Sequence, residues 1–197
     1  FDRLPMSLIY RANQSISPVC FAVLAMGAFA YLFTLSAWFC DDAFITIRCV
    51  KQWLSGNGIG FNPNERVMAF THPSWFLCIS AVVSLTGDFY ETIMLLSLCC
   101  SLIGVASLVW VAHKCPHPMM AMGCMVLLTF SKAFIDYGTS GLENPLTFAL
   151  FGALFLMLKT HKNSHSWIGV LIALLVLTRM DYGLILLPLS LLLGWRA

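Results

Sequence analysis

The sequence predicts an all-α integral membrane protein, built as a bundle of several membrane-spanning helices. Hydrophobic residues make up 59% of the chain and charged residues only 10%, with a mean hydropathy of +0.84, whereas soluble domains carry about 25% charged residues. The apolar residues also gather in long runs, and about 20 such residues suffice to cross a bilayer. The chain starts at Phe1 without a Met and stops against an apolar run, so we expect a fragment of a longer protein.

Six apolar runs are predicted to span the membrane within one domain that covers residues 1–197. The polar leader carries Arg3 and Arg11, as a cytoplasmic segment should. The first run is longer than a signal-peptide core and no small-residue cleavage pattern follows it, so we expect it to be retained. The predicted spans are about 17–39, 89–112, 119–135, 145–158, 167–178 and 182–195.

Residues 74–86 decide the topology, because an apolar run of about 12 residues is too short to cross a bilayer. We expect this run to be an interfacial helix at the end of an outer loop, residues 40–88. The short basic loops then lie on the cytoplasmic side, and every acidic residue except Asp2 lies on the other side. This topology brings together four acids that are far apart in the sequence: Asp41, Asp42, Glu143 and Asp181.

The outer loop is expected to begin with an amphipathic helix. Either Asp41 or Asp42 can cap this helix, which runs to about residues 52–54 before Gly56 stops it. Apolar side chains recur at three- and four-residue steps, which is typical of a helix lying at the interface. Its predicted apolar face consists of Phe44, Ile47, Val50 and Leu54.

The adjacent carboxylates Asp41 and Asp42 are the strongest local indication of chemistry. Charged groups at a membrane boundary are costly to desolvate and usually serve a purpose. Such a carboxylate can take a proton from an acceptor hydroxyl or coordinate a divalent cation. The alternative is a structural helix cap, and both readings hold if one acid caps while its neighbour reacts.

Two further residues of the outer loop are candidates for substrate or phosphate binding. Arg48 lies two turns beyond Asp41 and can pair with that acid, bind a phosphate through its guanidinium, or anchor the helix at the interface. His72, in a Thr-His-Pro turn, can orient a substrate or phosphate or serve only the structure of the turn.

Three charged residues later in the chain are also candidates. Glu143 stands in a second predicted outer loop, DYGTSGLENP at 136–145, and can either stabilise the start of the next helix or contribute a polar group to the cavity. Arg179 and Asp181 lie at the membrane edge, where they can form a structural ion pair or contact a sugar or phosphate.

The eight cysteines do not predict a metal centre or a disulfide framework. None of them has a zinc-ligand spacing, and most lie inside apolar runs, where cysteine behaves as a small hydrophobic residue. Cys40 and Cys49 flank the start of the outer loop and could pair, although nothing in the sequence requires it.

Three blocks of the sequence together resemble GT-C-fold membrane glycosyltransferases. The loop DDAFITIRCVKQWLSGNGIGFNPNERVMAFTHPSW at 41–75 looks like their first outer loop, closest to the group of the mycobacterial terminal arabinofuranosyltransferase and its bacterial relatives. SGLENPL at 140–146 and LTRMDYG at 177–183 match two further blocks of that group in the same order. The resemblance covers about residues 17–190. Three positions depart from the family pattern: Cys49, Asn64 and Met180.

The resemblance implies an inverting transferase that moves a pentose or hexose from a polyprenyl-phosphate donor to an extracytoplasmic glycan, lipid or protein acceptor. It implies Asp41 as the general base, with Asp42 holding the acceptor or a divalent cation; no other cofactor and no nucleic-acid partner is expected. A cation such as Arg48 would stabilise the leaving phosphate. The expected location is the bacterial inner membrane, with the site on the periplasmic face and a role in cell-envelope lipopolysaccharide or arabinan biosynthesis.

Two other functions compete with this one. A transporter or flippase for a lipid-linked or anionic substrate could use the same acids, and a catalytically dead scaffold could retain the fold. A transporter should carry polar residues at the midplane of several spans. The spans at 17–39, 89–112, 145–158 and 182–195 are nearly free of them, which favours an interfacial enzyme.

Overall fold

The computed structural model describes residues 18–63, 67, 69–115, 122–123, 126–128, 130–160 and 165–195, which form helices and connecting loops without a β-strand. The helices are α2 (Pro18–Leu35), α3 (Asp41–Leu54), α4 (Pro73–Thr86), α5 (Tyr90–His113), α7 (Lys132–Thr139), α8 (Asn144–Thr160), α9 (His165–Thr178), the 3₁₀ helix η1 (Met180–Tyr182) and α10 (Gly183–Trp195). The predicted all-α class is confirmed for these residues.

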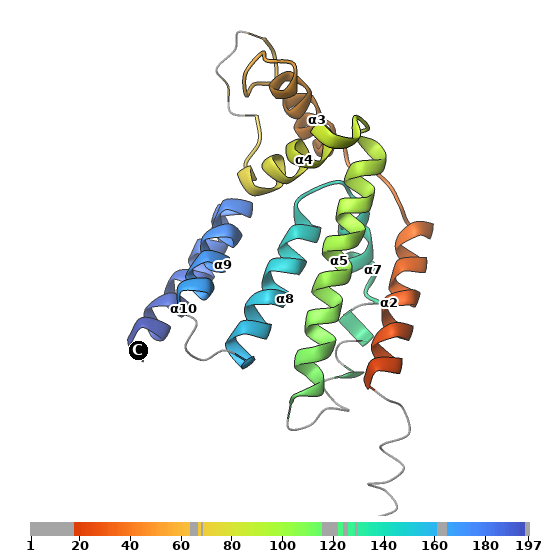
Figure 1. The fold of residues 1–197 in the computed structure, drawn as a ribbon, viewed down its shortest axis with the longest axis vertical. Helices are drawn as coiled ribbons and strands as arrows, with labels where there is room; N and C mark the ends of the chain where they lie inside the picture. Colours follow the sequence, from red (N-terminus) through yellow and green to blue (C-terminus); the bar gives the residue numbers. More distant parts are fainter. Residues whose placement is uncertain are drawn as a thin grey trace, which may run out of the picture.

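The elements lie in two groups (Figure 1). Helices α2, α5, α7, α8, α9 and α10 run side by side, and α3 and α4 lie together at one end of them. Helix α2 ends at that end, while α5, α8 and α10 begin there. The chain therefore returns to the same end several times, as the predicted topology requires.

Helix α5 is the one helix, among the residues described, that is long and apolar enough by itself to cross a membrane. It has 24 residues, and an 18-residue window within it has a mean hydropathy of 2.3 and is about half buried in the protein. Helices α7 and α8 pass the same test only as a pair, and they meet at a bend of 116°. The span predicted at 89–112 therefore has the required length and composition, and the larger multi-span bundle stays a prediction.

The predicted second outer loop is wrong in its first half. Residues 136–139 belong to α7 rather than to a loop. Lys132 and Asp136 form an ion pair of 2.7 Å at i, i+4 spacing, and the Thr139 hydroxyl donates to the Asp136 carbonyl, so the acid extends the helix instead of ending it. Much of the span predicted at 119–135 lies outside the described residues.

Helices α3 and α4 pack against each other and against the start of α5. Cys49 and Val50 of α3, Trp75, Phe76 and Ile79 of α4, and Ile93 of α5 form one buried cluster. The predicted apolar face of α3 is shifted by about one residue: the buried side chains are Ala43, Thr46, Cys49 and Val50, whereas Phe44 and Leu54 are exposed. Cys40 and Cys49 are both free thiols, so this pair forms no disulfide.

Helices α5 and α8 approach each other closely at two glycines. A Cβ atom at Gly104 would lie 2.8 Å from the Phe148 backbone, and one at Gly152 would lie 2.9 Å from Ser107 Cβ. This contact holds the two helices in parallel, so α8 begins beside the end of α5 from which α3 and α4 project (Figure 1).

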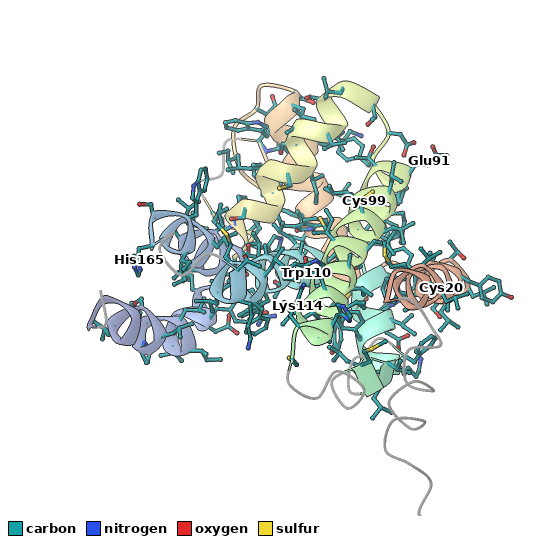
Figure 2. All side chains as sticks on the ribbon, turned by 60° about the horizontal axis from the view of Figure 1, so that its bottom comes forward. Cys20, Glu91, Cys99, Trp110, Lys114 and His165 are labelled. Carbon is teal, nitrogen blue, oxygen red and sulfur yellow. The ribbon has the colours of Figure 1, made fainter. Side chains whose placement is uncertain are left out.

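The far end of α5 is basic. Figure 2 shows Glu91 at one end of this helix and Trp110 with Lys114 at the other. The Lys114 Nζ atom is 5.3 Å from the centroid of the Trp110 ring, and Lys159 lies in the last turn of the parallel helix α8. Such a basic end is what the predicted cytoplasmic side requires.

Candidate functional site

The turn between α7 and α8 fixes the geometry of the site. The Cys40 amide donates to the Ser140 carbonyl at 2.9 Å, and the buried Trp75 indole donates to the Gly141 carbonyl at 3.1 Å. Gly141 has a φ of +78°, and a Cβ atom there would lie 2.7 Å from the Phe39 ring. The turn thereby holds together the starts of α3, α4 and α8.

His72 lies at the centre of a buried polar cluster. Its Nε2 atom is 2.8 Å from the Thr46 hydroxyl, and its Nδ1 atom is 3.6 Å from Glu143 Oε2. His72 and Glu143 are only 8% and 7% exposed. A carboxylate beside Nδ1 favours the proton on that nitrogen, which leaves Nε2 to accept from Thr46.

Burial lowers the pKa of His72 below its usual value, because a buried imidazolium loses its hydration. Glu143 raises this pKa and Arg179 lowers it, and burial is the largest of the three effects. The imidazole is therefore neutral at neutral pH, so His72 positions Thr46 and Glu143 without adding a charge.

Arg179 connects the buried carboxylate to the solvent. Its Nη1 atom is 3.4 Å from Glu143 Oε1, while Nε and Nη2 each lie 3.1 Å from one oxygen of Asp181. The hydrogen bonds between Arg179 and Asp181, together with the opposite charges of the two groups, raise the pKa of Arg179 and lower the pKa of Asp181. The Tyr182 ring lies 5.9 Å from the guanidinium carbon.

These residues border a cavity of about 500 Å³, a volume typical of small-molecule sites. Its lining comes from α3, the segment before α4, the turn before α8, and the junction of α9 with η1. The lining residues are Asp42, Ile45, Thr46, Ala69, Phe70, Thr71, His72, Leu142, Glu143, Arg179, Met180 and Asp181. Three carboxylates and one guanidinium thus face a shared space.

Five of the seven candidate residues line this cavity: Asp42, His72, Glu143, Arg179 and Asp181. Asp41 and Asp42 are both exposed, and Asp41 is not part of the lining. Neither aspartate is the N-cap of α3, because that position is Cys40. Both acids instead lie in the first turn, where they interact favourably with the helix dipole.

Arg48 has a different environment from the one that the sequence suggested. Its Nε donates to the Phe61 carbonyl at 2.8 Å, its Nη2 donates to Asn62 Oδ1 at 2.9 Å, and its guanidinium lies 4.4 Å from the Phe61 ring centroid. These contacts close the loop after α3, and Arg48 is not part of the cavity lining.

Thr46 is the most informative residue that the sequence reasoning missed. It is 2% exposed, lines the cavity and contacts His72. The signal was its spacing, because Thr46 follows Asp42 by four residues and such residues share a helix face.

The described residues contain no group of three or more His, Cys, Asp or Glu side chains that could hold a metal ion. A divalent cation at Asp41 and Asp42 would therefore need oxygen ligands from substrate or water, which Mg²⁺ readily accepts. The expected cation stays a prediction.

The fold and the cavity define a helical protein with a carboxylate-rich site at one end of an apolar helical body. No family model matches the chain, and no solved structure matches it. The chain is 32% identical over 152 residues to the terminal β-(1→2)-arabinofuranosyltransferase of Corynebacterium glutamicum. The matched region covers 74% of this chain and 22% of that protein. It is 30% identical over 186 residues to the terminal β-(1→2)-arabinofuranosyltransferase of Mycobacterium tuberculosis, covering 82% and 30% of the two proteins.

The chain is thus a relative of the terminal β-(1→2)-arabinofuranosyltransferases, and the predicted resemblance to this group is confirmed. It spans less than a third of the length of these relatives.

Proposed function

We propose that this chain carries the catalytic site of a GT-C-type membrane glycosyltransferase. The observation that carries the proposal is the convergence of Asp42, His72, Glu143, Arg179 and Asp181 on one cavity. The names of the relatives support a pentosyl transfer, with arabinofuranose as the first sugar to test.

The proposed donor is a polyprenyl-phosphate sugar. Arg179 is the cavity's guanidinium, and its planar fork suits phosphate oxygens and would stabilise the charge that develops on the leaving phosphate. The apolar helices below the cavity would let the polyprenyl tail remain in the bilayer.

The proposed reaction is an inverting displacement. A carboxylate takes the proton of an acceptor hydroxyl while that oxygen attacks the anomeric carbon, and the bond from this carbon to the phosphate oxygen breaks with its electron pair leaving on the phosphate. The family resemblance implies Asp41 as this base. The cavity supports Asp42, because Asp42 is the member of the pair that lines it, and we assign the proton transfer to Asp42.

The proposed acceptor is a glycan, lipid or protein on the extracytoplasmic side, and the proposed location is the bacterial inner membrane with the cavity facing the periplasm. The basic residues at the far ends of α5 and α8 support this orientation. A transport function is less well supported, since α5 carries no charged side chain between Glu91 and His113.

The proposal is tested with purified full-length protein and radiolabelled polyprenyl-phosphate arabinose. Replacing the base should slow transfer by about 10²- to 10⁴-fold, so we expect Asp42→Asn to fall in this range and Asp41→Asn to retain more activity. Labelled glycan is the readout.

Asp88→Asn is the matched control. Asp88 is an exposed acid whose Oδ1 accepts from the Glu91 amide at 2.8 Å, outside the cavity, and Asn can make the same hydrogen bond. Full transfer by Asp42→Asn would overturn the assignment of the base to Asp42, and absence of transfer by the wild type with every donor tested would overturn the function.

A further inference from the structure

Arg179 is held from two sides by carboxylates of very different accessibility. Glu143 is buried and lies 3.4 Å from Nη1, whereas Asp181 has 57% of its side chain exposed and occupies Nε and Nη2 at 3.1 Å each. Exposed ion pairs are weak and exchange readily, whereas a buried carboxylate that loses its cation is left uncompensated. The Glu143 contact is therefore the anchor and the Asp181 contact is the replaceable one.

Asp181 also occupies the part of the guanidinium best suited to a ligand. Two parallel N–H groups of arginine bind the oxygens of a carboxylate and of a phosphate with the same fork geometry. Both residues line the cavity, so a phosphate that enters it meets a fork already filled by a carboxylate two residues away in the chain.

We propose that Asp181 is an internal substitute for a phosphate group: it holds the Arg179 fork when the cavity is empty, and the phosphate of a ligand displaces it while Glu143 and the Tyr182 ring keep the guanidinium in place. This inference rests on the proposed function for the identity of the ligand, a polyprenyl phosphate or its sugar ester. It adds a role for Asp181 as a competitor that weakens phosphate binding.

The expected effect is a gain of affinity on removing the carboxylate. Because an exposed ion pair is weak, Asp181→Asn should bind phosphate about two- to fivefold more tightly than the wild type. Equilibrium dialysis of the full-length protein with labelled inorganic phosphate, repeated with farnesyl phosphate, measures this. Tighter binding of farnesyl phosphate than of inorganic phosphate would identify a lipid phosphate as the ligand, and equal binding would identify free phosphate.

Two controls separate displacement from a general effect of charge. Asp136→Asn removes a carboxylate that is paired with Lys132 outside the cavity, and it should leave phosphate binding unchanged. In an Arg179→Gln background, Asp181→Asn should give no gain, because the fork that both anions use is gone.

The inference is overturned if Asp181→Asn binds phosphate as tightly as the wild type or more weakly. It is also overturned if Asp181→Asn still increases phosphate affinity in the Arg179→Gln background, or if neither the wild type nor Asp181→Asn binds phosphate. The readout is binding rather than transfer. A protein that shows this exchange but transfers no sugar refutes only the proposed function, and a protein that transfers sugar without the exchange refutes only this inference.

Discussion

Arg48 and Arg179 are the same kind of side chain in two different surroundings, the loop after α3 and the edge of the cavity. Arg48 donates to the neutral oxygens of Phe61 and Asn62 and lies over the Phe61 ring, which closes the loop after α3. Arg179 faces two carboxylates, one buried and one exposed, at the edge of a cavity. An arginine whose donors are held by its own loop stabilises structure, whereas one held by an exposed carboxylate remains available to an anionic ligand.

The largest expected difference between the two regions is in catalysis. Arg179→Gln should lower kcat/KM by about 10²- to 10³-fold, the usual cost of losing a group that stabilises developing charge. Arg48→Gln should lower it by less than about tenfold and should instead make the loop at 55–63 more sensitive to proteolysis.

Steady-state transfer assays on both variants, with limited proteolysis alongside, measure this contrast. Arg179→Lys keeps the charge without the fork, so it should recover part of the loss if the charge stabilises the leaving phosphate. A larger catalytic loss for Arg48→Gln than for Arg179→Gln would reverse the assignment of the two arginines.

The next contrast is between two glycines, one in each region. Gly56 and Gly141 both have a φ of +78°, but a Cβ atom at Gly56 would meet nothing within 4 Å, whereas one at Gly141 would lie 2.7 Å from the Phe39 ring. Gly56→Ala should cost about 1 kcal/mol for the backbone conformation alone. Gly141→Ala should cost about 3 kcal/mol, because a steric clash is added.

Thermal unfolding of the two alanine variants in detergent measures these costs. Gly141→Ala should also reduce transfer, since the turn it disturbs accepts hydrogen bonds from Cys40 and Trp75 beside the cavity. Equal destabilisation by the two variants would show that the turn at 140–143 is not tightly packed in solution.

The sequence predicted best what depends on composition and on the distribution of charge along the chain. The short apolar run at 74–86 and the positions of the basic loops predicted that Asp41, Asp42, Glu143 and Asp181 would meet at one end. Three of these acids line one cavity, and Asp41 does not. The limits of α3, α4, α8 and α10 were also predicted to within about two residues, because turn formers and apolar runs mark them.

Features that depend on tertiary contacts were not predictable in the same way. The buried face of α3 is set by several contacts: Cys49 and Val50 pack in the cluster with α4, Ala43 lies against the turn at Gly141, and Thr46 hydrogen-bonds to His72. Arg48 is drawn to the loop oxygens at Phe61 and Asn62, a contact that no spacing in the sequence indicates. Asp136 belongs to α7, where it pairs with Lys132 one turn earlier, although the sequence analysis placed it in a loop.

The smallest expected effect concerns pH and separates the buried cluster from the exposed surface. The pKa of His72 is lowered in the folded protein by burial, against the opposing effect of Glu143, from a usual value of 6.5. Below about pH 6.5 the unfolded chain therefore binds a proton that the folded protein does not, so the free energy of unfolding falls as the pH falls. Above that pH the imidazole is neutral in both states and its contribution is complete.

His72→Gln should consequently show a smaller loss of thermal stability than the wild type between about pH 7.5 and 5.5, with a difference of a few degrees in Tm. His165→Gln is the matched control, because His165 is exposed at the start of α9 (Figure 2) and lies outside the cavity.

The two arginines extend the comparison. Arg179 lowers the pKa of His72, so Arg179→Gln should weaken the pH dependence of thermal stability, and Arg48→Gln should leave it unchanged. If Arg48→Gln altered the pH dependence as much as Arg179→Gln does, the loop after α3 and the cavity would be electrostatically one region, and the distinction between a structural and a ligand-facing arginine would fail.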